Sequence, residues 1–149
     1  MINTSNLQKA KNEIKTAKHP IIIQSQDLEF NRKMLEYGKF DILLSPELTG
    51  GWAGKFPRDK LKQLSSGLNH IMAKIAAKNG VAIGIDLQAI RSISNKKQKA
   101  QTIARIIQNI KTCRKAECGL VLLNYKDKKD AFEFLISLGA STKQAKEAL

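Results

Sequence analysis

Residues 81–87 read VAIGIDL, a nearly unbroken aliphatic run that contains a single acid. Three shorter runs share this character: IIIQ at 21–24, DILLS at 41–45 and GLVLLN at 119–124. A strand with one face in water alternates apolar and polar residues, whereas a strand covered on both faces is apolar throughout. These four runs therefore predict four buried strands.

Amphipathic patterns lie between and around these runs and predict helices. The expected helices are 4–18 (capped by Thr4 or Ser5), 27–37 (capped by Asp27 and ended by Gly38), 66–79 (capped by Ser66 and ended at Asn79-Gly80), 95–115, 127–138 and 141–148 (capped by Ser141 or Thr142). The expected apolar faces are Leu68, Ile71, Met72 and Ile75 on the third helix and Ile103, Ile106, Ile107, Ile110 and Cys113 on the fourth. Strands that alternate with helices pair in parallel through right-handed crossovers, which predicts an α/β fold.

The length of 149 residues predicts a single domain over 1–149 with one core. No apolar stretch approaches the roughly 18 residues of a membrane span, and no apolar signal core follows the first charges. Cys113 and Cys118 have no further Cys or His nearby to complete a zinc set, and Cys113 is expected in the core. We therefore expect a reduced cytoplasmic protein that is neither exported nor inserted in a membrane.

Positive charge dominates, with 26 Lys and Arg against 13 Asp and Glu and a net charge of +13. Between Asp59 and Glu117 the chain has one acid, Asp86, and twelve bases. A lysine-rich surface can simply be solvated. The isoelectric point of about 9.9 favours the other interpretation, which is that the protein binds nucleic acid through its phosphates.

Sequence patterns for catalysis are weak. His19 and His70 do not form a metal-binding pair, and GGWAG at 50–54 matches neither a P-loop nor a dinucleotide-binding turn. Asp41 and Asp86 could meet as paired carboxylates at one end of the sheet. Trp52 lies in an irregular stretch, 46–57, where it would plug the core or stack on a partner. We expect no catalytic residue, bound metal or cofactor in this chain.

Three blocks of sequence resemble ribonuclease P protein component 3, the archaeal counterpart of the eukaryotic thirty-kilodalton subunit. The central block is SSGLNHIMAKIAAKNGVAIGIDLQAI at 65–90, with its GLNH, AK, AAKN and VAIGI elements. Upstream, QDLEFNRKMLEYGKFDILLSPE at 26–47 has the family's Asn-Arg pair on a helix, Asn31 and Arg32, before a strand that ends in Pro46 and Glu47. Downstream, RIIQNIKTCRK and LGASTKQAKEAL resemble the last helices of the family. The resemblance covers roughly residues 20–149.

The resemblance implies an RNA-binding subunit of the ribonucleoprotein that removes the 5′ leader of precursor tRNA, with catalysis by the RNA and its Mg²⁺. It implies ribonuclease P RNA and protein component 2 as partners, in a heterodimer or heterotetramer, with precursor tRNA contacted indirectly. It also implies a barrel like that of triosephosphate isomerase, related to polymerase-histidinol phosphatase folds. Such barrels typically take about 250 residues, so four strands predict a reduced or open barrel. The segment NYKDKKD at 124–130 replaces a longer arginine-bearing loop of the family, with Lys126, Lys128 and Lys129 as substitutes.

The expected RNA contacts are the basic residues of the central segment, with arginine binding phosphate through two hydrogen bonds. They are Arg91, Lys96, Lys97, Lys99, Arg105, Lys111, Arg114 and Lys115, together with Lys74 and Lys78. Asn31, Arg32, Asn69 and His70 occupy motif positions and would order the fold or touch RNA. Two alternatives are a stand-alone nucleic-acid-binding or ribosome-associated domain, and a degenerate phosphoesterase that uses Asp41, Asp86 and Asp127.

Overall fold

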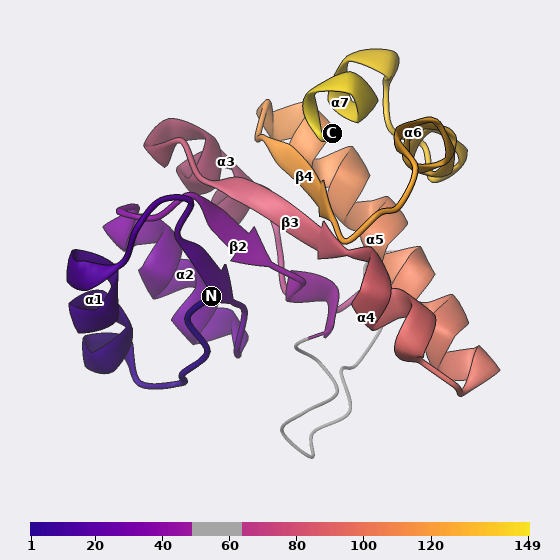
Figure 1. Ribbon diagram of the computed structural model, residues 1–149. Helices are drawn as coiled ribbons and strands as arrows, with labels where there is room; N and C mark the ends of the chain where they lie inside the picture. Colours follow the sequence, from indigo (N-terminus) through magenta and orange to yellow (C-terminus); the bar gives the residue numbers. More distant parts are fainter. Residues whose placement is uncertain (49–63) are drawn as a thin grey trace.

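A four-stranded parallel sheet forms the centre of the protein, in a computed structural model that describes residues 1–48 and 64–149 (Figure 1). The strands stand in the order β1-β2-β3-β4. Their bounds are β1 Ile22–Gln24, β2 Ile42–Leu44, β3 Ala82–Asp86 and β4 Leu120–Leu123. The α/β class and all four strand positions are confirmed.

Helices connect the strands and follow the last one. Their bounds are α1 Leu7–Thr16, α2 Leu28–Tyr37, α3 His70–Asn79, α4 Leu87–Ser92, α5 Lys96–Ala116, α6 Lys128–Ser137 and α7 Thr142–Glu147, with a 3-10 turn η1 at Pro46–Leu48. Asp27 and Ser141 cap their helices as predicted. The caps predicted for the first and third helices are wrong, because Asn6 caps α1 and Asn69 caps α3. The sequence patterns did not predict α4, a six-residue helix.

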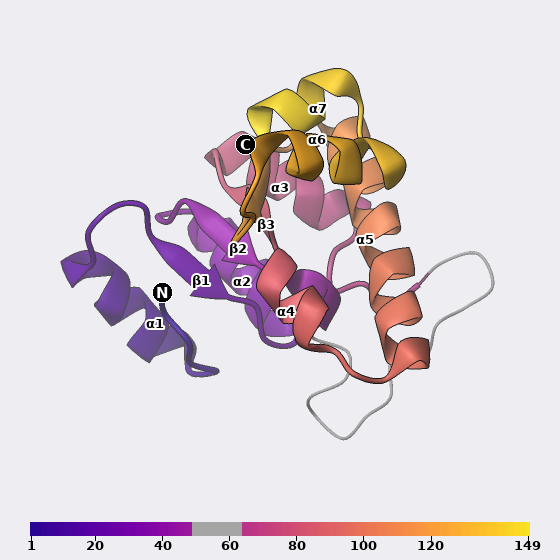
Figure 2. The same ribbon diagram turned by 45° about the vertical axis from the view of Figure 1, so that its right-hand side comes forward.

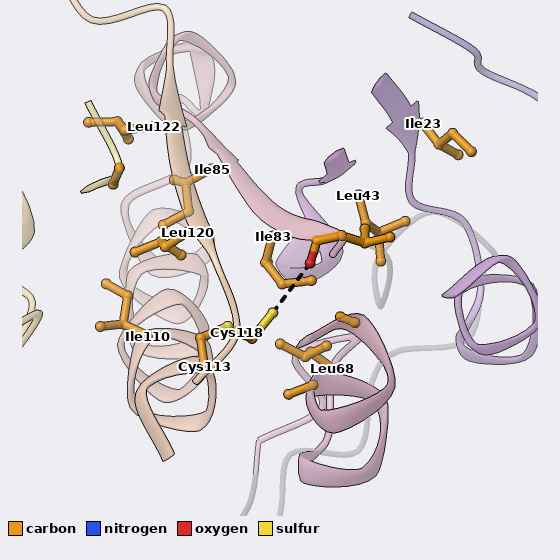
Figure 3. Close-up of a cluster of buried hydrophobic side chains, with 14 of the residues drawn as sticks. Ile23, Leu43, Leu68, Ile83, Ile85, Ile110, Cys113, Cys118, Leu120 and Leu122 are labelled. Atoms are coloured by element: carbon orange, nitrogen blue, oxygen red, sulfur yellow. Dashed lines mark hydrogen bonds between the residues drawn. The ribbon is translucent and has the colours of Figure 1, made fainter. Parts of the chain in front are cut away.

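The helices α1, α2, α3 and α5 pack in a row, with α2 against α3 and α3 against α5. In Figure 1 α2, α3 and α5 lie behind the sheet, while α6 and α7 lie beyond β4 at the opposite end from α1. The core between the helices and the sheet contains side chains from both, among them Leu43 of β2, Ile83 of β3 and Ile110 of α5 (Figure 3). Cys113 is fully buried there, which confirms it as a core residue.

Both edges of the sheet are covered in part by the ends of the chain. Ile2 forms a parallel bridge with Ile23 at the β1 edge, through Ile2 N–H to the Ile22 carbonyl and Gln24 N–H to the Ile2 carbonyl, both 2.8 Å. At the β4 edge, Leu122 N–H donates to the Ala148 carbonyl at 2.9 Å. The predicted open arrangement is therefore present among the described residues, with short backbone contacts that shield the edge strands.

Gly84 in β3 lets two side chains of the neighbouring strand β2 pack over it. A Cβ at this position would lie 2.7 Å from Ile42 Cγ2 and 3.0 Å from Leu44 Cδ1, so the two β2 side chains occupy that space. Ile42 and Leu44 are buried as a result. A glycine in the middle of a strand commonly marks such a close approach.

Two predicted core positions are wrong. Ile71 is 51% exposed and Ile107 is 43% exposed, because each lies at the margin of its helix's apolar face. Trp52 and the rest of the irregular stretch beyond residue 48 lie outside the described residues. In the described ranges, no helix combines the length and the apolar character that crossing a membrane requires.

Candidate nucleic-acid interface

The carboxyl end of the sheet, where the strands end, is organised by Asp86. Its Oδ1 atom accepts hydrogen bonds from the backbone N–H groups of Gln88 at 2.9 Å and Ala89 at 3.4 Å, which caps α4. The same oxygen accepts from Asn124 Nδ2 at 2.8 Å, so the end of β4 is tied to the end of β3. The acid in VAIGIDL thus fixes the direction in which α4 leaves the sheet.

Arg91 lies in the last turn of α4 and is exposed. Lys99, in the first turns of α5, donates from Nζ to the Arg91 carbonyl at 3.4 Å. Lys96 and Lys97 are exposed on the first turn of α5. In Figure 2, α4 and the start of α5 adjoin one another at the bottom of the molecule. These four residues, Arg91, Lys96, Lys97 and Lys99, are called the carboxyl-end group below.

A hollow of about 440 Å³ lies beside the carboxyl-end group. It is bounded by α4, α5, the segment after β4 and α6. Its lining residues are Leu87, Ile90, Arg91, Lys99, Tyr125, Lys126, Asp127, Asp130, Ala131 and Phe134. Apolar and charged side chains therefore meet in one concave site at the end of the sheet where α/β proteins place their ligands.

The remaining predicted cations lie elsewhere. Lys111, Arg114 and Lys115 are exposed near the end of α5, and Lys78 is exposed at the end of α3. These four residues, the amino-end group, lie near the start of the strands, since both helices run back along the sheet. Lys97 and Lys111 are separated by about 21 Å along the helix at 1.5 Å per residue. The predicted single basic surface is thus two separate groups, with Lys74 exposed in the middle of α3.

Arg105 does not belong to either group. It is 7% exposed and lies on the buried side of α5 with Thr102 and Asn109. The prediction that Arg105 lies on the exposed basic surface is therefore wrong. The spacing 102, 105, 109 follows the helical period beside the isoleucine stripe, and this polar stripe is the sequence signal that was available.

The motif residues divide into two kinds. Asn31 is fully buried, and its Oδ1 atom accepts from Gln26 N–H at 2.8 Å; Asn69 Oδ1 accepts from Met72 N–H at 2.9 Å as the α3 cap. Both therefore order the backbone. Arg32 is exposed and pairs with Glu36 (Nε to Oε1, 3.0 Å), while His70 is exposed on the first turn of α3.

The expected meeting of Asp41 and Asp86 does not occur. Asp41 precedes β2 and lies at the amino end of the sheet, where its Oδ2 atom bonds His19 Nδ1 at 2.7 Å and the Ile21 N–H group. Because Ile42 pairs with Ala82, Asp41 is level with Val81. Asp86 lies five residues beyond Val81 along the strand, about 16 Å at 3.3 Å per residue. The phosphoesterase trio of Asp41, Asp86 and Asp127 is therefore not assembled. Within residues 1–48 and 64–149, no three His, Cys, Asp or Glu side chains gather as a metal site.

Comparison with known proteins bears directly on the resemblance. No family model matches the chain. Ribonuclease P protein component 3 from Methanosarcina mazei and from Methanosarcina acetivorans is 32% identical to it over 120 residues, 80% of this chain and 44% of the relative. The protein of the same name from Methanocaldococcus jannaschii is 24% identical over 124 residues, 81% of this chain and 47% of the relative. This chain is similar in sequence to ribonuclease P protein component 3.

The chain spans slightly less than half the length of these component 3 relatives. A solved structure, the cryo-EM structure of archaeal ribonuclease P with mature tRNA, contains a similar chain. The TM-score is 0.78 with 23% identity, over 99% of this chain and 62% of that chain. This likeness establishes the fold that this chain shares with that protein. The predicted resemblance to component 3 is confirmed.

Glu47 has an environment that the sequence did not predict. Its side chain is 1% exposed, and neither carboxylate oxygen accepts a hydrogen bond of ordinary geometry from the described residues. Burial raises the pKa of Glu47 to about 7, although the nearby Glu47 backbone N–H and Ser45 hydroxyl lower it; the negative charge of Asp86 adds a smaller rise. Ser45, two residues earlier, has a left-handed backbone with φ of 51°. Glu47 is therefore a buried acid beside the carboxyl end of the sheet, and the signal available in the sequence was an acid two residues after the predicted strand at 41–45.

Proposed function

We propose that this chain is an RNA-binding protein subunit of ribonuclease P that supports RNA-catalysed removal of the 5′ leader from precursor tRNA. The observation that carries the proposal is the similarity to component 3 along four-fifths of the chain. The net charge of +13 and the two exposed cation groups agree with a ligand rich in phosphate. The RNA and its Mg²⁺ supply the chemistry, and this chain supplies positive charge and shape.

The mechanism is electrostatic. Folded RNA packs phosphates closely, and their repulsion opposes the active fold. Cations held on a rigid α/β body offset that repulsion and release counterions from the RNA. The carboxyl-end group is held on two helices whose positions are fixed by Asp86 and by the contact between Lys99 and Arg91. Two groups about 21 Å apart along α5 can touch phosphates of two separate RNA segments.

Partners of the proposed subunit are ribonuclease P RNA and protein component 2, with precursor tRNA contacted through the assembly. The similar solved chain belongs to a structure of archaeal ribonuclease P with mature tRNA, which supports an assembly of this kind. Component 2 as the direct protein partner is part of the proposal.

The test is cleavage of precursor tRNA by ribonuclease P RNA at low Mg²⁺ with component 2 present, with and without this chain. We expect stimulation by the wild type, a loss with Arg91→Ala, and a smaller loss with Lys97→Ala, because a guanidinium can bind phosphate through two hydrogen bonds. Absence of stimulation by the folded wild-type chain overturns the subunit role.

Salt dependence separates phosphate contacts from other contacts. If about five phosphates are neutralised, the slope of log K against log salt is roughly −3.5 to −4.5 at 0.7 to 0.9 per contact. Each lysine that binds phosphate should reduce the slope by about 1 when replaced by alanine. A slope near zero contradicts the electrostatic mechanism.

A stand-alone basic nucleic-acid-binding domain is the second candidate, favoured by the net charge of +13 and the exposed cations, which suit any ligand rich in phosphate. Equal affinity for ribonuclease P RNA and for unrelated RNA or DNA, without stimulation of cleavage, would support that function instead.

A further inference from the structure

We infer that the hollow between α4 and α6 is a pocket for one unstacked nucleotide of single-stranded RNA, with the base against its apolar wall and the phosphate at its cations. The inference rests on the proposed function, which it makes more specific. A protein that only screened charge would need exposed cations and no cavity.

The size and floor of the pocket suit a nucleotide base. Its 440 Å³ falls within the range of about 300–1,000 Å³ that is typical of ligand pockets. Leu87, Ile90 and Ala131 form buried apolar lining, and Phe134 is half-buried beside them. Covering such an apolar surface removes it from water, which is favourable, so the pocket favours a flat, weakly polar ligand.

Two aromatic side chains line the same hollow. Tyr125 is half-buried, and its hydroxyl donates to the Leu149 carbonyl at 3.2 Å, which holds the side chain at the pocket. Phe134 contributes the second ring from α6. Proteins bind unstacked RNA bases by stacking them on aromatic rings.

Cations from three different elements converge on the pocket. Arg91 comes from α4, Lys99 from α5 and Lys126 from the segment after β4. None of the three is in an ion pair within residues 1–48 and 64–149. A phosphate in this position would receive charge from separate parts of the fold, which is a geometry that one helix cannot provide.

Two carboxylates, Asp127 and Asp130, also line the pocket. They argue against bare phosphate as the ligand, because they offset part of the positive charge. Asp127 Oδ1 already accepts from Asp130 N–H at 2.9 Å as the α6 cap, which leaves the exposed Asp130 carboxylate as an acceptor. Carboxylates accept from exocyclic amino groups of bases. The pocket is therefore expected to prefer adenine, cytosine or guanine to uracil, which has no exocyclic amino group.

The experiment measures binding of fluorescein-labelled hexanucleotides to the full chain by anisotropy, with hexaadenylate, hexauridylate and a duplex of equal length as probes. The expected result is hexaadenylate bound about tenfold more tightly than hexauridylate, which corresponds to one good base contact of about 1.4 kcal/mol. Equal affinity for the duplex and both single strands overturns the pocket.

One variant, Asp130→Ala, separates the pocket from general electrostatic attraction. It removes a negative charge, so charge screening alone predicts tighter binding of every probe. It also removes the side-chain acceptor, so the pocket predicts that the preference for hexaadenylate falls from about tenfold to near unity. An unchanged preference in a folded Asp130→Ala variant contradicts the inference.

Lys99→Ala and Lys15→Ala form a matched pair, since Lys99 lines the hollow and Lys15, exposed on α1, belongs to neither cation group. We expect a loss of about five- to tenfold for Lys99→Ala and less than twofold for Lys15→Ala. Equal losses in the two variants contradict the pocket. The pocket is also contradicted if an acidic peptide competes with the hexanucleotides for binding and the chain shows no preference between hexaadenylate and hexauridylate. A base preference without stimulation of precursor-tRNA cleavage supports the pocket and contradicts the subunit role. Stimulation of cleavage without a base preference supports the subunit role and contradicts the pocket.

Discussion

The amino and carboxyl ends of the sheet differ in how they treat polar groups and backbone strain. At the amino end, Asp41 is bonded by His19 and by the Ile21 N–H group, and the left-handed turns that lead into β2 and β3 are glycines, Gly38 and Gly80. Glu117, an exposed cap before β4, is the exception with φ of 56°. Apart from Glu117, the amino end therefore has a hydrogen-bonded carboxylate and glycines at its left-handed positions.

At the carboxyl end, residues other than glycine adopt left-handed backbone conformations, and some buried polar atoms lack hydrogen-bond partners among the described residues. Ser45 follows β2 with φ of 51°, which costs a serine energy, whereas Asn124 follows β4 with φ of 59°, a conformation that asparagine tolerates better. The Glu47 carboxylate and Asn31 Nδ2 are buried, and neither finds a hydrogen-bond partner in the part of the chain that the structure describes. Strain and unsatisfied polar groups gather at functional ends of α/β proteins, so the contrast supports the carboxyl end as the place where this chain binds its ligand.

The largest expected effect is that of Glu47→Gln. The pKa of Glu47 rises from 4.5 in the unfolded chain to about 7, so the folded state binds the proton more tightly. The free energy of unfolding is therefore highest below pH 4.5 and falls as the pH rises through 7. At pH 8 Glu47→Gln should be more stable than the wild type by about 3 kcal/mol, at 1.36 kcal/mol per pKa unit, and unchanged at pH 4.

Urea unfolding at pH 4, 6 and 8 provides the measurement, with Glu133→Gln on the exposed side of α6 as the matched control. The control should leave the pH profile unaltered. A wild-type stability that does not decline between pH 4.5 and 7 would show that Glu47 is solvated, and the contrast between the two ends would then weaken.

At the amino end, Gly38→Ala should destabilise the protein by about 2–3 kcal/mol. The left-handed backbone alone, with φ of 65°, costs about 1–2 kcal/mol. A Cβ would also lie 2.8 Å from Asn79, whose Nδ2 atom donates to the Leu35 carbonyl at the end of α2.

Gly80→Ala is the control for Gly38→Ala, because Gly80 has a similar φ of 69° and a Cβ there would meet no described atom within 4 Å. It should cost about 1–2 kcal/mol. The difference between the two variants in thermal unfolding measures the Asn79 contact. Equal losses would mean that Asn79 moves aside freely.

The sequence predicted the amino end better than the carboxyl end, for physical reasons. Buried strands and glycine-ended helices depend on local patterns, so the strand within 81–87 and the end of α2 at Gly38 are confirmed. Helix starts were less certain, since Ser66 and Asn69 are both good caps and only packing chose Asn69.

The basic surface was predicted only in part. A count of lysines and arginines does not say which of them the core will cover, and Arg105 is covered. The hollow could not be predicted, because its lining comes from four segments that the fold brings together. The unpredicted helix α4 was too short to show a periodic pattern, yet it carries Arg91.

Ser45→Gly should relieve strain at the carboxyl end. Glycine adopts φ of 51° without the cost of about 1–2 kcal/mol, but it gives the unfolded chain about 0.5–1 kcal/mol of extra freedom. The expected net effect is a stabilisation of up to about 1 kcal/mol, measured by urea unfolding. Ser137→Gly at the end of α6 is the control and should destabilise the protein slightly. A loss in both variants would mean that Ser45 is not strained.

The smallest effect is that of Asp41→Asn, and its pH dependence has the opposite sign to that of Glu47. The hydrogen bond from Ile21 N–H, together with His19, lowers the pKa of Asp41 below its usual 3.8. The stabilisation is therefore present above pH 3.8 and is lost as the pH falls through the lower folded-state pKa. Because the side chain is 39% exposed, solvent screening limits the loss in Asp41→Asn at pH 6 to under about 1 kcal/mol. Urea unfolding from pH 2.5 to 8 should place the Asp41 contribution at the acid end and the Glu47 contribution near neutrality. His19→Ala tests which partner matters, since the Ile21 N–H bond remains and most of the Asp41 effect should persist. Loss of the whole effect in His19→Ala would mean that an exposed ion pair, rather than the backbone, secures the amino end.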